Sequence, residues 1–502
     1  MKAWITCLFL GVSMSVFAQN PGALPEVLSD YEQALIEDQL EDNHLNIRPQ
    51  FFTQKIEPTL DGQQKDFKTI PTGLSAKPLL ELSGGGSLSA ENKAIYSAIG
   101  GAHLTWNKDR WFAQSTVAGF LIEGQSYVSA IQDSLHIVPG LGYSSNGPLG
   151  SNGLYATGRL NFKANDYFSF ELGNDKNFWG DGYRSLILSN QAAPYPYAKI
   201  TTDIWKIQYV NLWTMLSDVS RGERIGDSRR KYTSMHALSW NFHRKWNISL
   251  YEMVIWQARD TLSDRGLDLN YFNPVIFYRP IEFSLGSADN EIVGLSLRFS
   301  PNKKNQIYSQ VLLDEFLFDE LVDRSGWWAN KFGVQLGFKS FDVLKEGLDV
   351  QSELNYVRPF TYAHGSVLQN YGHLNQSMAH PLGANFIEWV TFLKYQKENW
   401  TIQNEFIWAI YGRDRDGDNY GGNLFNSYAN PFRTYGNYIA QGLKSTLHYN
   451  ELNIVRHVDA ALPFDISLTY MLRYESNEFF KTTENGVMLG VRVNPVGWTR
   501  DF

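Results

Sequence analysis

The stretch FWGDGYRSLILSNQAAPYPYAKI, residues 178–200, gathers side chains that could do chemistry. Trp179 and Tyr183 offer flat apolar rings, while Asp181 and Arg184 offer a carboxylate and a guanidinium fork. Aromatic faces can pack against a sugar ring, and charged groups can bind its hydroxyls or acids. The stretch therefore predicts one of two structures. It is either a loop that holds a ligand such as a sugar, or a glycine-turned loop in which Asp181 and Arg184 form charge pairs.

Enzymatic interpretations of this stretch do not fit. A phosphate-binding loop needs glycines that open a helix, because the helix N-terminus supplies the N–H groups that face the anion. Here GDGYRS leads into Leu-Ile-Leu, and Pro194 and Pro196 forbid a long helix. The G-x-S-x-G elbow of hydrolases is also absent from the stretch. We found no catalytic constellation in the chain, and we expect that the protein is not an enzyme.

Two further segments resemble metal sites only superficially. DRDGDNYGGN, residues 414–423, alternates aspartates, but an EF-hand needs glycine sixth and glutamate twelfth, where this chain has Gly417 fourth and Phe425 twelfth. Three histidines of the polar segment 357–383 are spaced by nine and seven residues, which matches no zinc pattern. These are His364, His373 and His380. We expect solvated loops there, with no metal and no other cofactor.

The N-terminus predicts export. Residues 1–18 have a lysine at position 2 and an apolar run too short to span a membrane, which is typical of a signal peptide cleaved before Gln19. The run contains Cys7, the one cysteine of the chain, so the mature protein is expected to form no disulfide. Residues 19–77 include the acidic, helix-compatible LPEVLSDYEQALIEDQLEDN, and we expect them to form a partly helical periplasmic segment or plug.

Composition narrows the class. Aromatic residues make up 15% of the chain, with 15 Trp, 27 Tyr and 31 Phe. After the signal peptide there is no apolar run of about 18 residues, so helical membrane spans are excluded. A net charge of −8 argues against nucleic acid as a partner. These features predict one exported, aromatic-rich, sheet-built domain over residues 78–502.

Apolar and polar residues alternate with a period of two in long stretches. Each stretch is expected to be a strand with one apolar and one polar face. The stretches run nine to twelve residues, the length that crosses a bilayer at a tilt, and they carry charges in mid-strand that a packed soluble core would not tolerate. A polar lumen would accommodate these charges. The clearest examples are 153–164, 331–341, 348–356 and 466–475.

Short and long connections alternate between these stretches, as in bacterial outer-membrane barrels with short periplasmic turns and long surface loops. The alternation breaks between residues 174 and 232 unless a strand is placed there, and RSLILSN (184–190) is the natural candidate. This gives an all-β transmembrane barrel of about 18 antiparallel strands. VMLGVRVNPVGWTRDF is expected to be its final strand, closing on Phe502. Short turns are expected at 107–110, 164–166, 244–245, 301–305, 342–346 and 397–399.

A barrel lumen studded with charges needs internal partners. We therefore expect Asp181 and Arg184 to fold inward and to meet charges that line the barrel, such as Glu353 or Arg358. Candidate ligand-binding residues, with Trp179 and Tyr183, also include three from the segment 357–383. These three are Arg358, His364 and His380.

Several strings together resemble the Bacteroidota branch of the capsule assembly Wzi family, some members of which are described as the gliding-motility protein RemB. They are FELGNDKNFWGDGYRSLILSNQAAPYP, YFNPVIFYRPIEFSLGSADN, LNYVRPFTYAHGSVLQNYGHLNQSMAHPLGANFIE and DRDGDNYGGN. The resemblance implies an 18-stranded barrel in the cell outer membrane. For the enterobacterial members it implies attachment of capsular polysaccharide to the cell surface, but no lectin residue of theirs matches a position in this chain.

The expected function is therefore to attach or organise surface polysaccharide, with capsular or other surface polysaccharide and outer-membrane lipid as partners and with the protein as a monomer. Two alternatives stay open. One is a component of gliding or secretion machinery with protein partners, and the other is a passive porin.

Overall fold

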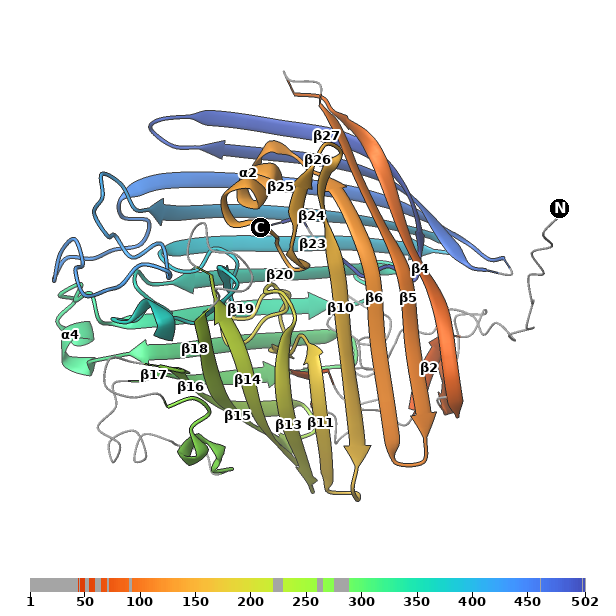
Figure 1. The fold of residues 1–502 in the computed structure, drawn as a ribbon, viewed down its shortest axis with the longest axis horizontal. Coiled ribbons are helices and arrows are strands. Elements are labelled where there is room, and N and C mark those ends of the chain that lie inside the picture. Colours follow the sequence, from red (N-terminus) through yellow and green to blue (C-terminus); the bar gives the residue numbers. More distant parts are fainter. Residues whose placement is uncertain are drawn as a thin grey trace, which may run out of the picture.

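The computed structural model describes residues 44, 46–49, 54–58, 65–69, 72–89, 93–219, 229–259, 265–274, 289–460, 462–498 and 500–501. These residues form a closed antiparallel barrel of 18 long strands, in which each strand pairs with its neighbour and β27 pairs back with β4 (Figure 1). The strands are β4 (Gly73–Ser87), β5 (Ala94–Lys108), β6 (Trp111–Glu123), β10 (Gly150–Lys163), β11 (Phe168–Asp175), β13 (Tyr195–Ile204), β14 (Ile207–Asp218), β15 (Arg229–His243), β16 (Trp246–Gln257), β17 (Asn290–Phe299), β18 (Asn305–Glu315), β19 (Lys331–Ser340), β20 (Leu348–Val357), β23 (Phe386–Lys397), β24 (Trp400–Arg413), β25 (Leu443–Val458), β26 (Phe464–Ser476) and β27 (Lys481–Val493).

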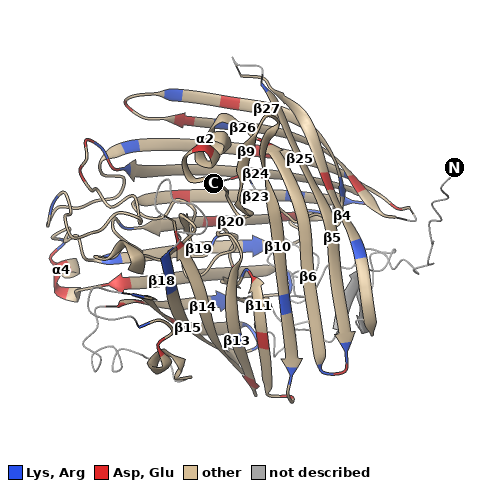
Figure 2. Ribbon diagram, in the orientation of Figure 1, with Lys and Arg blue, Asp and Glu red and all other residues tan. Residues whose placement is uncertain are grey.

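Period-two alternation builds the barrel with its apolar side chains outside. On the outer face Leu336 is 57% exposed and Leu354 46%, whereas on the inner face Lys331 and Glu353 are buried. This is the reverse of a soluble protein, because the outer face of a membrane barrel meets hydrocarbon. Figure 2 shows that charged residues recur along the strands as well as in the connections. The predicted fold class, an all-β transmembrane barrel, is confirmed.

The six predicted short turns fall between consecutive strands, and two more follow the same pattern at 205–206 and 459–463. The position of one strand is a correction. Residues 184–190 form no barrel strand, and the strand needed in that region is β13, which begins at Tyr195 and includes Pro196. Residues 176–194 instead fold into the lumen, because their Leu-Ile-Leu run finds an apolar core there.

The end of the chain departs from the expected final strand. β27 ends at Val493, and the described residues that follow it, 494–498 and 500–501, leave the sheet and lead into the lumen, where Asp501 is 7% exposed. The C mark in Figure 1 accordingly lies over the barrel interior. At the other end the first barrel strand begins at Gly73, slightly before the expected domain boundary at residue 78.

Smaller elements decorate the connections. The expected signal peptide and the helix-compatible stretch 24–43 lie outside the described residues. In the described part of the chain, no helix is long and apolar enough to cross a membrane. The smaller elements are β1 (Ile47–Arg48), β2 (Gln54–Pro58), β3 (Lys65–Thr69), α2 (Ser126–Leu135), β7 (Ile137–Val138), β8 (Gly142–Tyr143), β9 (Ser145–Gly147), β12 (Phe178–Trp179), η2 (Leu269–Phe272), α4 (Phe318–Val322), η3 (Val367–Gln369), β21 (Gly372–His373) and β22 (Gln376–Ser377).

The assignment of the apolar face to the outside of the barrel can be tested by substitution. Leu336→Lys, in the middle of β19, should lower the free energy of unfolding by about 2–4 kcal/mol, since it places an ammonium group in hydrocarbon. The measurement is urea unfolding of the barrel refolded in lipid vesicles. The matched control is Leu344→Lys, because Leu344 lies in a short turn and is 96% exposed. An equal effect of the two substitutions would contradict the assignment of the outer face.

Candidate functional site in the barrel lumen

The inward-folded segment 176–194 closes the lumen on the side of the long loops. Leu186, Ile187 and Leu188 are completely buried in an apolar cluster. Two tyrosines of the connection after β20 fix its backbone, as Tyr362 Oη donates to the Leu186 carbonyl and Tyr371 Oη to the Ile187 carbonyl, each at 2.8 Å. The alternation of the strands predicts a polar lumen. The structure differs, because one part of the lumen is a dry apolar core.

Glu353 of β20 holds the turn of this segment. Its carboxylate accepts the backbone N–H of Tyr183 at 2.9 Å and the backbone N–H of Arg184 at 3.0 Å. The approach depends on Gly182, because a Cβ at that position would collide with the Glu353 carboxylate and lie 2.7 Å from the Arg184 carbonyl oxygen. Arg184 thus meets Glu353 as predicted, but through its main chain and not through its guanidinium.

The guanidinium of Arg184 reaches two other carboxylates. Its Nη2 lies 3.3 Å from Glu388 Oε1 and 2.9 Å from Asp501 Oδ2, and it donates to the Asp501 carbonyl at 2.8 Å. Arg184 is 1% exposed. Burial opposes its charge, yet Asp501 and Glu388 together raise the pKa of Arg184 well above its usual value. The charge is therefore permanent, and it joins the inward segment to β23 and to the segment after β27.

His380 joins the same cluster through Glu388. Its Nε2 lies 2.6 Å from Glu388 Oε2, while its Nδ1 accepts the backbone N–H of Leu382 at 3.2 Å. Because Nδ1 accepts, Nε2 carries the proton of the neutral ring and donates it to the carboxylate. Burial lowers the pKa of His380 although Glu388 favours the charged form.

The other predicted residues lie in different places. Asp181 is paired with Arg298 of β17, whose Nη1 donates to Asp181 Oδ1 at 3.1 Å. Trp179 is completely buried, pairs with β1 and stacks on Tyr251 with ring centroids 5.8 Å apart, so it is part of the interior and offers no face to a ligand.

Two candidates from the connection after β20 lie apart from the Arg184 cluster. Arg358 donates to the Trp327 carbonyl at 3.2 Å and does not meet Asp181, contrary to the expectation that these charges would pair. His364 lies edge-on to the Tyr428 ring, with centroids 5.4 Å apart. No three His, Asp or Glu side chains of the described residues gather as a metal ion would require.

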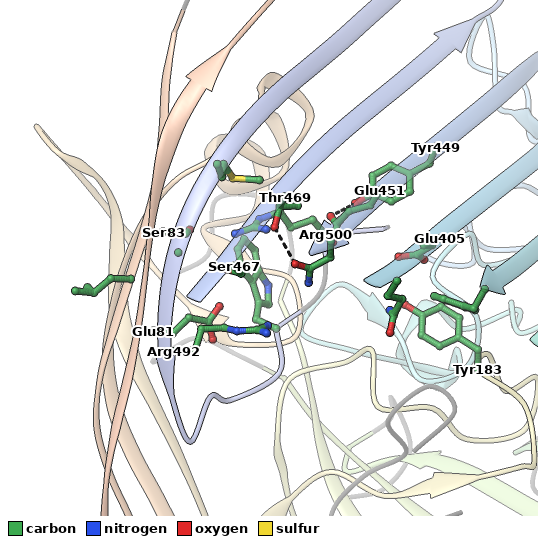
Figure 3. Close-up of a pocket in the computed structure, with 17 residues that line it drawn as sticks. Glu81, Ser83, Tyr183, Glu405, Tyr449, Glu451, Ser467, Thr469, Arg492 and Arg500 are labelled. Atoms are coloured by element: carbon green, nitrogen blue, oxygen red, sulfur yellow. Dashed lines mark hydrogen bonds between the residues drawn. The ribbon is translucent and has the colours of Figure 1, made fainter. Parts of the chain in front are cut away.

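Beside Tyr183 the lumen opens into a cavity of about 160 Å³ (Figure 3). Tyr183 is half-buried there, and its hydroxyl donates to Asp501 Oδ2 at 2.5 Å. Carboxylates, guanidinium groups, amides and hydroxyls form most of the remaining wall. The polar lining residues are Glu81, Ser83, Gln403, Glu405, Tyr449, Glu451, Asn453, Ser467, Thr469, Arg492 and Arg500.

Sequence reasoning missed the two acidic partners of Arg184. Glu388 lies 204 positions from Arg184 and Asp501 lies 317, and no local pattern links them. One signal was available for Glu388, which is the one acidic residue in the mostly apolar stretch FIEWVTFL, residues 386–393, where a buried charge needs a partner. No such signal marked Asp501, since the residues around it were expected to continue the sheet.

A closed antiparallel barrel with an apolar outer face and charged residues inside is an outer-membrane β-barrel. The sequence matches no protein-family profile and no curated protein. Among solved structures, the chain is similar to Wzi of Escherichia coli, an outer-membrane protein involved in group 1 capsule assembly and a carbohydrate-binding β-barrel. The identity is 11%, the alignment covers 83% of this chain and 85% of Wzi, and the TM-score is 0.51.

Similarity extends to porin-type barrels at lower scores. OccAB2 of Acinetobacter baumannii matches at 8% identity over 84% of this chain and 97% of its own, with a TM-score of 0.46. OprD of Pseudomonas aeruginosa matches at 7% identity over 83% of this chain and 94% of its own, with a TM-score of 0.44. At 11% identity the similarity to Wzi shows the barrel fold alone, and the function requires a separate argument.

Arg184→Ala should destabilise the barrel. Removing the guanidinium leaves Glu388 and Asp501 buried without their cation, which typically costs about 3–5 kcal/mol. The expected result is a lower temperature for the heat-induced shift of the folded band on gels. Arg415→Ala is the matched control, because Arg415 forms its ion pair with Glu478 at the surface and should change that temperature little. Equal temperatures for wild type and Arg184→Ala would show that the cluster does not stabilise the fold.

Acid should destabilise the barrel through buried neutral histidines of its connections. Burial lowers the pKa of His373 from 6.5 to about 3. Below about pH 6.5 the His373 ring is protonated in the unfolded chain but stays neutral in the folded chain. The free energy of unfolding therefore falls as the pH falls below about 6.5. At pH 5 the loss for one such histidine is on the order of 2 kcal/mol. The pKa is likewise lowered for His44, His364 and His380.

The measurement is the heat-denaturation temperature at pH 7 and at pH 5 for wild type and for His373→Gln. Glutamine does not titrate, so the variant should lose less stability than wild type between the two values. Identical losses of stability in wild type and in His373→Gln would contradict the conclusion that His373 stays neutral in the folded protein at pH 5.

Proposed function

We propose that this barrel holds a polysaccharide at the cell surface, on the face formed by its long loops. The observation that carries the proposal is a group of exposed aromatic rings in the connection between β24 and β25. Phe432 is 45% exposed, Tyr435 54% and Tyr438 57%. Large aromatic faces open to solvent are unfavourable unless something packs on them, and the apolar face of a sugar ring is a suitable partner.

Arginine accompanies these rings. The guanidinium carbon of Arg433 lies 5.1 Å from the Phe432 ring centroid and 5.6 Å from that of Tyr438. Arg433 Nη1 donates to the Gly436 carbonyl at 3.5 Å. A guanidinium stacked in this way can use its other terminal N–H groups to bind hydroxyls or the carboxylate of an acidic sugar.

The aromatic group is held in place by a second loop. The backbone N–H groups of Gly436 and Asn437 donate to the carbonyls of Ser325 and Gly326, both at 2.8 Å, and the N–H of Trp328 donates to Thr434 at 2.9 Å. A surface fixed in advance loses little conformational entropy when a ligand binds, which favours affinity for a flexible polymer.

Two observations favour this function over a passive porin. The segment 176–194 and the segment 494–501 both occupy the lumen and are fixed to it by buried hydrogen bonds and ion pairs. In addition, the solved structure with the higher TM-score, that of Wzi, is described as a carbohydrate-binding barrel. The resemblance of the sequence to the Wzi family points in the same direction, with the protein acting as a monomer without enzymatic activity.

The alternative favoured by the RemB-like part of that resemblance is a role in gliding or secretion machinery. An aromatic surface with an arginine also suits a protein partner. The two functions predict different lost phenotypes in a deletion strain, namely capsule staining for the polysaccharide function and colony spreading for the motility function.

The test is complementation of the deletion strain with wild type and with the double variant Tyr435→Ala/Tyr438→Ala. We expect the variant to fold, to reach the outer membrane and to lose most of the retained polysaccharide. Trp205→Ala is the matched control, because Trp205 is 71% exposed in a short turn at the opposite end of the barrel. Lost spreading with normal capsule staining would favour the motility function. Steady conductance of the wild type in planar bilayers would favour a porin.

A further inference from the structure

We infer that the luminal cavity beside Tyr183 is a second binding site, for an uncharged saccharide unit. The inference is independent of the loop surface described above. The walls of the cavity come from β4 and from β23 to β27, at positions around the middle of the strands and towards the short turns. For example, Gln403 lies near the start of β24 at Trp400, and Arg492 lies next to the end of β27 at Val493.

The guanidinium of Arg500 is the first reason. Arg500 lines the cavity with its guanidinium carbon 5.0 Å from the Trp498 ring centroid, and within the described residues its guanidinium makes no direct hydrogen bond or ion pair. The Trp498 ring and the Arg500 main chain are held in place, because Trp498 Nε1 donates to the Pro139 carbonyl at 2.9 Å and the Arg500 carbonyl accepts from Tyr127 Oη at 2.6 Å. The guanidinium fork of Arg500 can then donate to a ligand that brings acceptors.

Acceptors lie beside Arg500 in the same cavity. Glu451 accepts one hydrogen bond from Tyr449 Oη at 2.7 Å, and a carboxylate has further lone pairs to offer. Figure 3 shows Glu451, Thr469 and Arg500 arranged around the same space. Hydroxyl groups both donate and accept, so a polyhydroxylated ring can satisfy the donors and the acceptors of the cavity at once.

The mixture of acidic and basic groups selects against a charged ligand. Carboxyl and guanidinium groups both line the cavity, and one of the arginines, Arg492, already lies 3.6 Å from Asp465. An acidic sugar would meet the carboxylates, and a cationic one would meet Arg492 and Arg500. The glutamates are Glu81, Glu405 and Glu451.

Two aromatic residues and the volume complete the fit. Tyr183 and Trp498 supply apolar ring surface in an otherwise polar wall. The volume of about 160 Å³ holds on the order of ten water molecules, which is comparable to one sugar ring. Gln403, Glu451, Asn453 and Arg492 are half-buried, so solvent reaches the cavity.

The test is calorimetric titration of the purified full-length protein in detergent with glucose, galactose, mannose and N-acetylglucosamine, and with glucuronate and glucosamine as charged counterparts. We expect at least one uncharged sugar to bind, and its charged counterpart to bind at least tenfold more weakly. Arg500→Gln and Glu451→Gln should each weaken binding by about tenfold, the usual effect of losing a hydrogen bond to a charged group.

Arg456→Gln is the matched control. Arg456 also stacks on a tryptophan, 5.0 Å from the Trp400 ring centroid, but it does not line the cavity. This variant should bind like wild type. Absence of binding by all four uncharged sugars would overturn the inference, since the cavity would then hold water only. Stronger binding of glucuronate or glucosamine, or unchanged binding in both cavity variants, would overturn it as well.

Discussion

The arrangement of the lumen depends on one buried cation. Arg184 has left water almost completely, and such a transfer is tolerable only because carboxylates and a carbonyl receive its N–H groups. Those acceptors belong to a strand and to the segment after the last strand. A single guanidinium therefore fixes where two chain segments meet inside the barrel. Its neighbour Tyr183 faces the polar cavity, and the Leu-Ile-Leu run that follows it packs into the apolar cluster.

The barrel thus has an interior of two kinds. Towards the long loops, side chains such as Met253, Ile255 and Phe386 surround the inward segment and form a core like that of a soluble protein. Towards the short turns, the strands carry carboxylates, amides and hydroxyls around open space. Membrane hydrocarbon stabilises the outside of both halves in the same way, so the sequence is free to vary the inside. The apolar part of the interior makes the barrel rigid, and the polar part has room for a ligand.

The sequence predicts the alternation along each strand but not the contacts between residues on opposite sides of the lumen. Alternation with a period of two depends on strand geometry alone, so the faces of β19 and β20 and the strand total could be predicted. The proline in β13 hid that strand, because Pro196 reads as a strand breaker although the barrel tolerates it at the long-loop end of the strand. Asp181 and Arg184 were expected to turn inward, and they do. Their partners Arg298, Glu388 and Asp501 could not be named, because which residues face each other across a lumen depends on how the whole sheet closes.

The backbone bonds between the loops 316–330 and 414–442 have a mechanical consequence. A force on a ligand bound to the exposed rings acts on the chain near Tyr435. The backbone hydrogen bonds to the Ser325 and Gly326 carbonyls transmit part of that force to the loop 316–330. The force then leaves through β18 and β19 as well as through β24 and β25, two strand pairs on separate arcs of the barrel wall. Each pair is hydrogen-bonded to the neighbouring strands along its length. The tension therefore acts as shear on many hydrogen bonds at once. A tether attached at this point is anchored by the wall of the barrel and not by one hairpin.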